Sequence, residues 1–312
     1  MRDKKRGNTV GLIVLFCVAF MVMANGARAQ TLEPRMYSNL PVGLNFLLVG
    51  YGYSQGEVLV DPSVPLDDLN ARIHMPVFAY LRSFAVMGRA SKVDIVLPFA
   101  WLSGSAKVEG QEERVYREIS GLADLSVRFN INLYGAPALS LKEFASYRQN
   151  TIFGVSLQVT APVGQYDSSR LVNISSHRWT FKPEIGLSQA IGRWNLETSA
   201  ALSIYTTNNN FWDGKIRKQN PILSLQGHTI YNFKRGVWAS FDITFYRGGQ
   251  TTIDGEVKND LQTNWRLGAT LAFPLNRRNS IKLYASSGVY TRTGTAFSLL
   301  GIAWQYRWGG GV

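Results

Sequence analysis

Apolar and polar residues alternate along most of this chain, in twelve segments of ten to fifteen residues that are separated by turn or loop residues. In the segment 236–248, for example, the odd-numbered residues from Val237 to Phe245 are apolar, whereas most even-numbered residues between them are polar. A period of two predicts β-strands with one apolar and one polar face. The predicted strands are 42–54, 71–85, 91–102, 121–134, 150–163, 178–190, 193–206, 218–232, 236–248, 260–274, 279–291 and 295–308.

Two all-β architectures have such strands: a soluble sandwich, whose apolar faces pack together, and a membrane barrel, whose apolar faces meet lipid. The strands are longer than the roughly 5–6 residues usual in globular proteins and suit the roughly 9–11 residues of a tilted spanning strand. Short turns after the even-numbered strands also alternate with long polar loops after the odd-numbered ones, as in outer-membrane barrels. The pattern therefore predicts an all-β fold, a transmembrane antiparallel β-barrel of about 12 strands.

Two connections break this alternation of lengths. The link 292–294 is short where a long loop is expected, and the link 135–149 is long where a short turn is expected. Within the second link, the spacing of Leu139, Leu141, Phe144 and Ala145 predicts a short amphipathic helix.

The first 29 residues have the features of a signal peptide. Basic residues between Arg2 and Arg6 precede a short apolar run, and Ala27-Arg28-Ala29 offers a cleavage site before Gln30. We therefore expect a signal peptide at 1–29, a periplasmic lead-in at 30–41, the barrel at 42–308 and a C-terminal tail at 309–312. The one cysteine, Cys17, lies in the segment that would be removed, so the mature chain has no thiol for a disulfide or a metal site.

The formal net charge is +12, and the predicted signal peptide holds five basic residues and one acidic residue, which leaves +8 for the mature chain (12 − 4). Export argues against nucleic acid as the partner of this charge, and lipopolysaccharide phosphates or anionic solutes fit better. We expect the mature protein in the outer membrane of a Gram-negative bacterium. The partners expected there are outer-membrane lipid, lipopolysaccharide, the barrel-assembly machinery and a small-molecule solute.

Tryptophan gathers near the predicted strand ends, where indole rings would lie at the membrane–water interface. Trp238 is the exception, because its position in the alternation points inward. The predicted interface aromatics are Trp101, Trp179, Trp194, Trp265, Trp304 and Trp308.

The polar faces of the strands carry charges of both signs, which inside a barrel must be paired or hydrated. They could cross-link the interior or could line a narrow path for a solute, and the residues alone leave both interpretations open. The candidate lumen-lining residues are Arg72, His74, Asp94, Asp124, Arg128, Lys182, Glu184, Glu197, His228, Asp242, Arg266 and Lys282.

A catalytic or metal site finds little support in the residues. The chain has only three histidines, and Ser224, on the same predicted face as His228, lies about 13 Å away along the strand. Three scattered histidines without cysteine do not suggest zinc. We therefore expect no enzyme activity, no catalytic residue, no metal and no cofactor. A lipid- or peptide-hydrolysing barrel stays open as an alternative, because cross-strand neighbours do not follow from sequence.

Three stretches between about residues 40 and 206 resemble a known family. The most specific blocks are GLADLSVRF at 121–129 and SSHRWTFKPEIGLS at 175–188. They resemble the outer-membrane transporter family of the MetA pathway of phenol degradation. The resemblance implies an outer-membrane barrel that helps small hydrophobic or aromatic compounds to enter the cell, and it implies no catalytic or ligand residues. One departure is that Trp308 is followed by Gly309–Val312, whereas such barrels usually end on an aromatic residue.

The function predicted from the sequence is passive transport or binding of a small solute, hydrophobic or aromatic if the resemblance holds. A barrel hydrolase and a sealed structural barrel are the alternatives. Because twelve strands enclose a bore that side chains largely fill, we expect a narrow path rather than an open pore.

Overall fold

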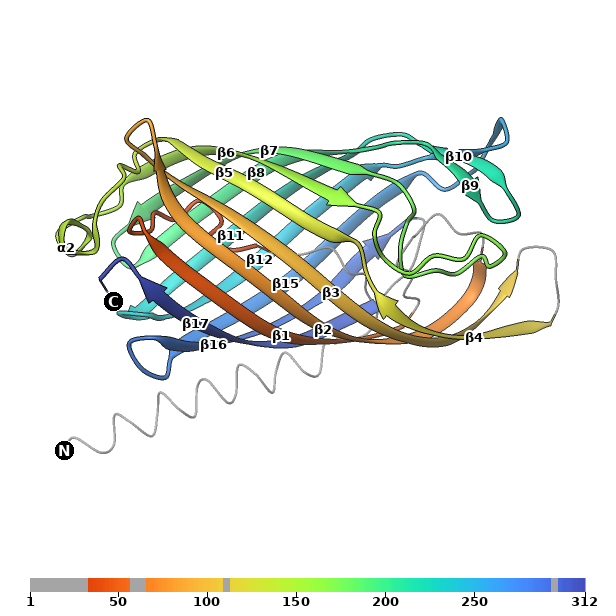
Figure 1. Ribbon diagram of the computed structural model, residues 1–312, viewed down its shortest axis with the longest axis horizontal. Helices are drawn as coiled ribbons and strands as arrows, with labels where there is room; N and C mark the ends of the chain where they lie inside the picture. Colours follow the sequence, from red (N-terminus) through yellow and green to blue (C-terminus); the bar gives the residue numbers. More distant parts are fainter. Residues whose placement is uncertain (1–32, 57–65, 109–112, 293–296, 312) are drawn as a thin grey trace.

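The computed structural model describes residues 33–56, 66–108, 113–292 and 297–311. The predicted signal peptide and residue 312 lie outside the described residues. Figure 1 shows a barrel of long, tilted strands.

Twelve antiparallel strands form the barrel wall, and the pairing of the first with the last closes it. Each strand pairs with its neighbours in the barrel in an antiparallel ladder, so the backbone groups of the wall are satisfied without water, as hydrocarbon surroundings require. The strands are β1 (Leu44–Gly56), β2 (Leu66–Val86), β3 (Arg89–Val108), β5 (Leu125–Tyr134), β6 (Thr151–Ala161), β7 (Thr180–Ile191), β8 (Trp194–Tyr205), β11 (Ile222–Lys234), β12 (Val237–Gly248), β15 (Gln262–Pro274), β16 (Asn279–Thr291) and β17 (Phe297–Gly309).

Five short strands lie outside this ring. β4 (Arg114–Leu122) pairs with the far half of β3 and leads into β5. A separate four-stranded sheet consists of β9 (Asn208–Phe211), β10 (Lys215–Gln219), β13 (Thr251–Ile253) and β14 (Glu256–Val257).

The two ends of the barrel differ. One end, here the terminal end, carries the C-terminus and tight turns, including Met87-Gly88 with φ of 49° and 73°. Positive φ at both central residues is the conformation that matches the twist of a two-residue hairpin. The other end, here the loop end, carries β4 and the small sheet (Figure 1). The predicted alternation of short and long connections is thus present in the structure.

The long link at the terminal end holds the predicted helix in reduced form. Only Leu141–Phe144 is helical (α2), and none of its residues is buried. Ser140 caps it, because its hydroxyl accepts from the Glu143 backbone N–H while the Glu143 carboxylate accepts from the Ser140 backbone N–H. The apolar spacing that predicted an amphipathic helix therefore does not mark a buried face. No helix among the described residues is long and apolar enough to cross a membrane.

The outside of the barrel is apolar. Along β11 and β12, Leu223, Leu225, Phe241 and Ile243 are all exposed, while the residues between them are buried or half-buried. A continuous exposed apolar surface of this kind would aggregate in water and is stable against hydrocarbon. The apolar stripe of each strand therefore faces lipid, as predicted for a transmembrane barrel.

The predicted interface tryptophans lie on this outer surface, each between 37% and 49% exposed. Trp101, Trp179 and Trp265 lie toward the loop end, and Trp194, Trp304 and Trp308 lie at the terminal ends of β8 and β17. Trp238 does face the interior, as its position in the alternation predicted, because the Arg35 guanidinium carbon lies 5.1 Å from the centre of its ring.

An arginine on the lipid-facing side should weaken the fold. Phe241 lies near the middle of β12 and is 46% exposed, so Phe241→Arg would bring a charge into the centre of the hydrocarbon. We expect the free energy of unfolding to fall by about 2–4 kcal/mol. Urea titration in lipid bilayers measures it. Asp213→Arg, in an exposed turn of the loop end, is the control and should change little. An equal loss in both variants would argue against a lipid-facing Phe241.

Candidate functional site

The interior of the barrel gathers most of the charged residues singled out in the sequence. Strands β3, β5, β7, β8, β11, β12, β15 and β16 direct them inward, because each shares its parity with the buried positions of its strand. The nine that face the interior are Asp94, Arg128, Lys182, Glu184, Glu197, His228, Asp242, Arg266 and Lys282.

Arg72 and His74 are corrections to the predicted lumen set. Both lie on the outer side of β2: Arg72 is exposed, and His74 contacts the hydroxyl of Tyr51 at 2.5 Å beside exposed side chains. The alternate residues of β2, Ala71 and Ile73, are the buried ones. The parity rule failed here because the inner face of β2 is apolar, so the polar residues mark the outside.

Asp124 lies in the break between β4 and β5 and ties loop-end segments together. Its carboxylate accepts hydrogen bonds from the backbone N–H of Gly164 at 3.1 Å and of Ser176 at 3.0 Å. The Ser176 hydroxyl donates a third, at 3.2 Å. Asp124 therefore holds the β6–β7 loop against the barrel rim, a role that the sequence alone did not indicate.

Removing this carboxylate should loosen the loop without disrupting the barrel. Asp124→Ala leaves two backbone N–H groups without their acceptor, at a cost of about 1–3 kcal/mol. We expect faster proteolysis between residues 164 and 176, with unchanged thermal unfolding of the strands. Asp167→Ala, whose carboxylate bonds only within the same loop to Ser169, is the matched control. Equal cleavage rates in the wild type and the Asp124 variant would contradict the anchoring role.

The chain before β1 lies inside the barrel rather than in the periplasm, where the sequence analysis placed it. In Figure 1 the red segment that precedes β1 is within the terminal end of the barrel. Residues 33–41, here the N-terminal segment, hydrogen-bond to side chains of six wall strands, which are β2, β3, β5, β7, β8 and β11, and Arg35 also contacts the ring of Trp238 on β12. It follows that the barrel is occupied by its own chain at this level.

Tyr37 fastens the N-terminal segment to the wall. Its ring is 1% exposed and lies against Gly154 of β6 and Gly186 of β7, which face each other across the strand pair. A β-carbon at either glycine would overlap the ring, so the two glycines form a cradle that only the absence of side chains permits. The phenol donates to Glu184 Oε1 at 2.9 Å, and Asn132 Nδ2 donates to the Tyr37 carbonyl at 3.2 Å.

Charged wall residues hold the rest of the segment. Arg128 Nη2 donates to Glu33 Oε1 at 2.9 Å, and Arg128 also lies 3.6 Å from Asp94. Glu197 accepts from the Arg35 backbone N–H at 2.7 Å and from the Ser38 hydroxyl at 3.3 Å. Lys92 donates to the Met36 carbonyl. These interior charges therefore bind part of the chain itself instead of pairing only with one another.

His228 and Asp242 form a second pair nearer the middle of β11 and β12, whereas Lys182 pairs with Glu184 on β7 at 3.5 Å and Arg266 of β15 contacts other residues. His228 Nδ1 lies 2.7 Å from Asp242 Oδ1, and the hydroxyl of Ser240 donates to Asp242 Oδ2 at 3.0 Å. Arg266 donates to Ser286 and lies 5.1 Å from the Phe297 ring centre. A small cavity lies between His228 and Gln226 of this wall and Met36 and Tyr37 of the N-terminal segment.

The pair of His228 and Asp242 does not have the arrangement of a hydrolase. A nucleophilic serine must hydrogen-bond to the histidine, but Ser240 bonds to the far oxygen of Asp242 instead. His74, the other candidate, contacts Tyr51 on the outer surface. Among the described residues, no three His, Cys, Asp or Glu side chains are grouped closely enough to hold a metal ion.

The sequence model of one family matches residues 51–306, and its description reads "Putative MetA-pathway of phenol degradation". This chain belongs to that family. The match covers all twelve strands of the barrel except the start of β1 and the end of β17. It confirms the resemblance recognised in the sequence blocks.

Solved structures share the fold. The COG4313 outer membrane channel from Pseudomonas putida F1 has a TM-score of 0.75 at 18% identity, covering 89% of this chain and 100% of that chain. The transport unit of the autotransporter AIDA-I from Escherichia coli has a TM-score of 0.52 at 7% identity, covering 89% and 93%. At these identities the likeness concerns the fold alone. No curated protein matches the sequence significantly.

Proposed function

We propose that this family member is an outer-membrane channel that passes small solutes passively and has no enzyme activity. The observation that carries the proposal is a closed transmembrane barrel whose interior is occupied by a short segment held through reversible contacts. Hydrogen bonds and ion pairs to the wall can be exchanged for water when the segment moves. A sealed structural barrel has no use for a segment that can be displaced from the lumen, whereas a channel could be opened by such a displacement.

The solute proposed is a small molecule with an apolar or aromatic body. The description of the family, which refers to phenol degradation, supports this class. So does the fold shared with a protein described as an outer membrane channel. The solute would diffuse through the part of the lumen that the N-terminal segment does not fill, or through the space that opens when the segment moves away. The loop end would be the outer mouth.

The cellular setting belongs to the same proposal. Cleavage of residues 1–29 would release the mature chain into the periplasm, and the barrel-assembly machinery would insert it. The exposed apolar surface would then meet outer-membrane lipid, and basic residues at the loop end would face lipopolysaccharide.

Planar-bilayer recording of the purified mature chain tests the proposal. A channel should show discrete conductance steps, whereas a sealed structural barrel should show none, in the wild type or in a variant with a weakened N-terminal segment such as Tyr37→Ala. Lipid and ester hydrolysis measured on the same preparation should stay at the level of the empty bilayer. Hydrolysis that disappears in His228→Ala would instead favour the enzyme.

A further inference from the structure

The interior of the barrel has two unlike sides. The inward positions of β1 and β2 are apolar, and among the side chains described on these strands none that faces inward is charged. Only two are polar, Ser54 and Ser83, and their hydroxyls donate to backbone carbonyls. The inward residues, here the apolar wall, are Leu44, Phe46, Leu48, Gly50 and Gly52 of β1 with Ala71, Ile73, Met75, Val77, Ala79 and Leu81 of β2.

Most of the inward ionic groups lie on the opposite side of the interior, while Lys92 and Asp94 of β3 and Lys282 of β16 lie on strands closer to the apolar wall. Strands β5, β7, β8, β11 and β12 direct Arg128, Glu184, Glu197, His228 and Asp242 inward, all of them largely buried. These strands, together with β6, are here the polar wall. The lumen is therefore amphipathic in cross-section, whereas a water-filled pore needs polar groups on all sides.

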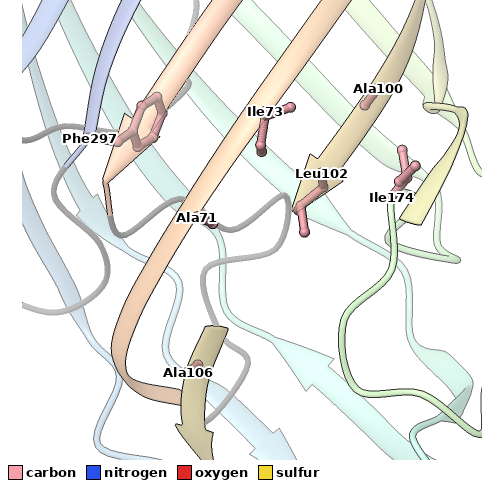
Figure 2. Packing of buried hydrophobic residues seen from close by; sticks show 7 residues of the cluster. All are labelled: Ala71, Ile73, Ala100, Leu102, Ala106, Ile174 and Phe297. Atoms are coloured by element: carbon pink, nitrogen blue, oxygen red, sulfur yellow. The ribbon is translucent and has the colours of Figure 1, made fainter. Parts of the chain in front are cut away.

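The apolar wall is continuous along the barrel. At the loop end it joins a buried cluster in which Ile73 packs with Leu102 of β3, Phe297 of β17 and Ile174 of the β6–β7 loop (Figure 2). At the terminal end it reaches Leu44 and Phe46, which are buried beside the N-terminal segment. An apolar strip thus runs along β1 and β2 between the buried loop-end cluster and the buried terminal end.

The middle of the strip is only partly covered by other side chains. Leu48, Val77 and Ala79 are half-buried, although they lie inside a closed barrel, and Met75, also half-buried, packs on one side against the loop-end cluster. By contrast, Ala71 and Ile73 toward the loop end and Leu44 and Phe46 at the terminal end are buried. Apolar surface that is open to the lumen is unfavourable as long as it stays in contact with water. A solute that covers it would recover this free energy.

Most charge contacts of the N-terminal segment are made with the other side of the interior, and its hydrogen bond to β2 is at Ser83, at the terminal end of the strip. Its contacts through Glu33, Arg35 and Tyr37 are with Arg128, Glu197 and Glu184, which lie on β5, β8 and β7. The occupant with access to the strip must be small enough to enter the barrel from its mouth, which excludes macromolecules.

We propose that the apolar wall is the path along which a solute crosses the channel, here the solute track, and that Met75 and Val77 determine its selectivity. The solute moves along the track with its apolar side on β1 and β2 and its polar group toward the polar wall. This proposal rests on the proposed channel function. It assigns the solute a two-sided chemistry: a small apolar body that carries one charged or hydrogen-bonding group.

Relative ion permeability tests the track. Under bi-ionic conditions the reversal potential gives the permeability of benzenesulfonate relative to methanesulfonate, and of benzyltrimethylammonium relative to tetramethylammonium, whatever the number of channels. These ions keep their charge at any working pH and do not cross lipid freely. Within each pair the charged group is alike and the apolar body differs. The measurement is made on the full mature chain, in the wild type and with Tyr37→Ala.

The double variant Met75→Gln with Val77→Thr keeps side-chain size and makes the strip polar. We expect it to lower the permeability of the aromatic ion relative to its methyl counterpart several-fold, for the pair of ions that carries the current, with little change in conductance to small salts. Met75→Leu, which stays apolar, and Gln158→Met, which faces inward from β6 on the polar wall, should leave the ratio unchanged. Heat-modifiable mobility in electrophoresis verifies that each variant is folded.

Two results would overturn the inference in distinguishable ways. If the double variant conducts and its permeability ratio equals that of the wild type, the track is wrong and the channel function stands. If neither the wild type nor the Tyr37→Ala chain conducts any ion, the channel function fails and the track fails with it.

Discussion

Tyr37→Ala should raise the ratio of open to occupied channels by at least about 100-fold. The ring is 1% exposed in the cradle of Gly154 and Gly186, and truncating a buried aromatic side chain costs about 3–5 kcal/mol, where each 1.4 kcal/mol is tenfold in an equilibrium. The loss falls on the occupied state alone, because the released segment makes no such contact. Single-channel recording measures it as the fraction of time spent at the higher conductance level.

Three further variants separate gating from simple widening of the lumen. Tyr37→Phe keeps the ring and removes only the hydrogen bond to Glu184, so we expect an effect of about 1 kcal/mol, less than tenfold. Gly186→Ala should resemble Tyr37→Ala, because the new β-carbon displaces the ring.

Tyr284→Ala is the matched control. Its ring also lies over a glycine, Gly301 of β17, but it belongs to the wall and holds no part of the N-terminal segment. It should change the unit conductance and not the open fraction. Equal open fractions in the wild type and Tyr37→Ala would show that Tyr37 does not hold the segment closed.

Asp242→Ala should be the most destabilising single change in the barrel interior. Asp242 is fully buried and accepts from Ser240, beside His228 at 2.7 Å. Removing one partner of a buried ionic cluster leaves the other uncompensated and typically costs about 3–5 kcal/mol. The free energy of unfolding in lipid bilayers, measured by urea titration, should fall by that amount.

The double variant His228→Leu with Asp242→Leu controls for the ionic origin of the effect. Replacing both partners with apolar residues of similar volume is often neutral, so it should recover much of the lost stability. Glu256→Ala, an exposed carboxylate that pairs with Lys258 in the small loop-end sheet, should change stability by less than about 1 kcal/mol. If Asp242→Ala cost no more than Glu256→Ala, the buried cluster would not contribute to stability.

Strand positions followed from the sequence with little error, because lipid on the outside imposes a strict period of two. The predicted segments 236–248 and 279–291 differ from β12 and β16 by one residue at most. The largest differences are at β3, which runs six residues beyond the predicted end, and at 121–134, which is divided into β4 and β5 by a break at Asp124. Where a strand extends beyond the membrane, its outer side chains no longer contact hydrocarbon. The alternation of apolar and polar residues is therefore weaker there, and the strand end is harder to predict.

The sequence by itself determined which residues meet lipid on most strands, and therefore the barrel, because that choice depends only on local alternation between apolar and polar side chains. Only the tertiary structure decided the orientation of β2, where both faces contain apolar residues and Ile73, not His74, faces inward. It alone placed Tyr37 between Gly154 and Gly186, since these residues are more than one hundred positions apart in the chain and no period relates them. Contacts of that range are set by how the barrel closes, because the paired strands β6 and β7 bring the two glycines together beside the N-terminal segment.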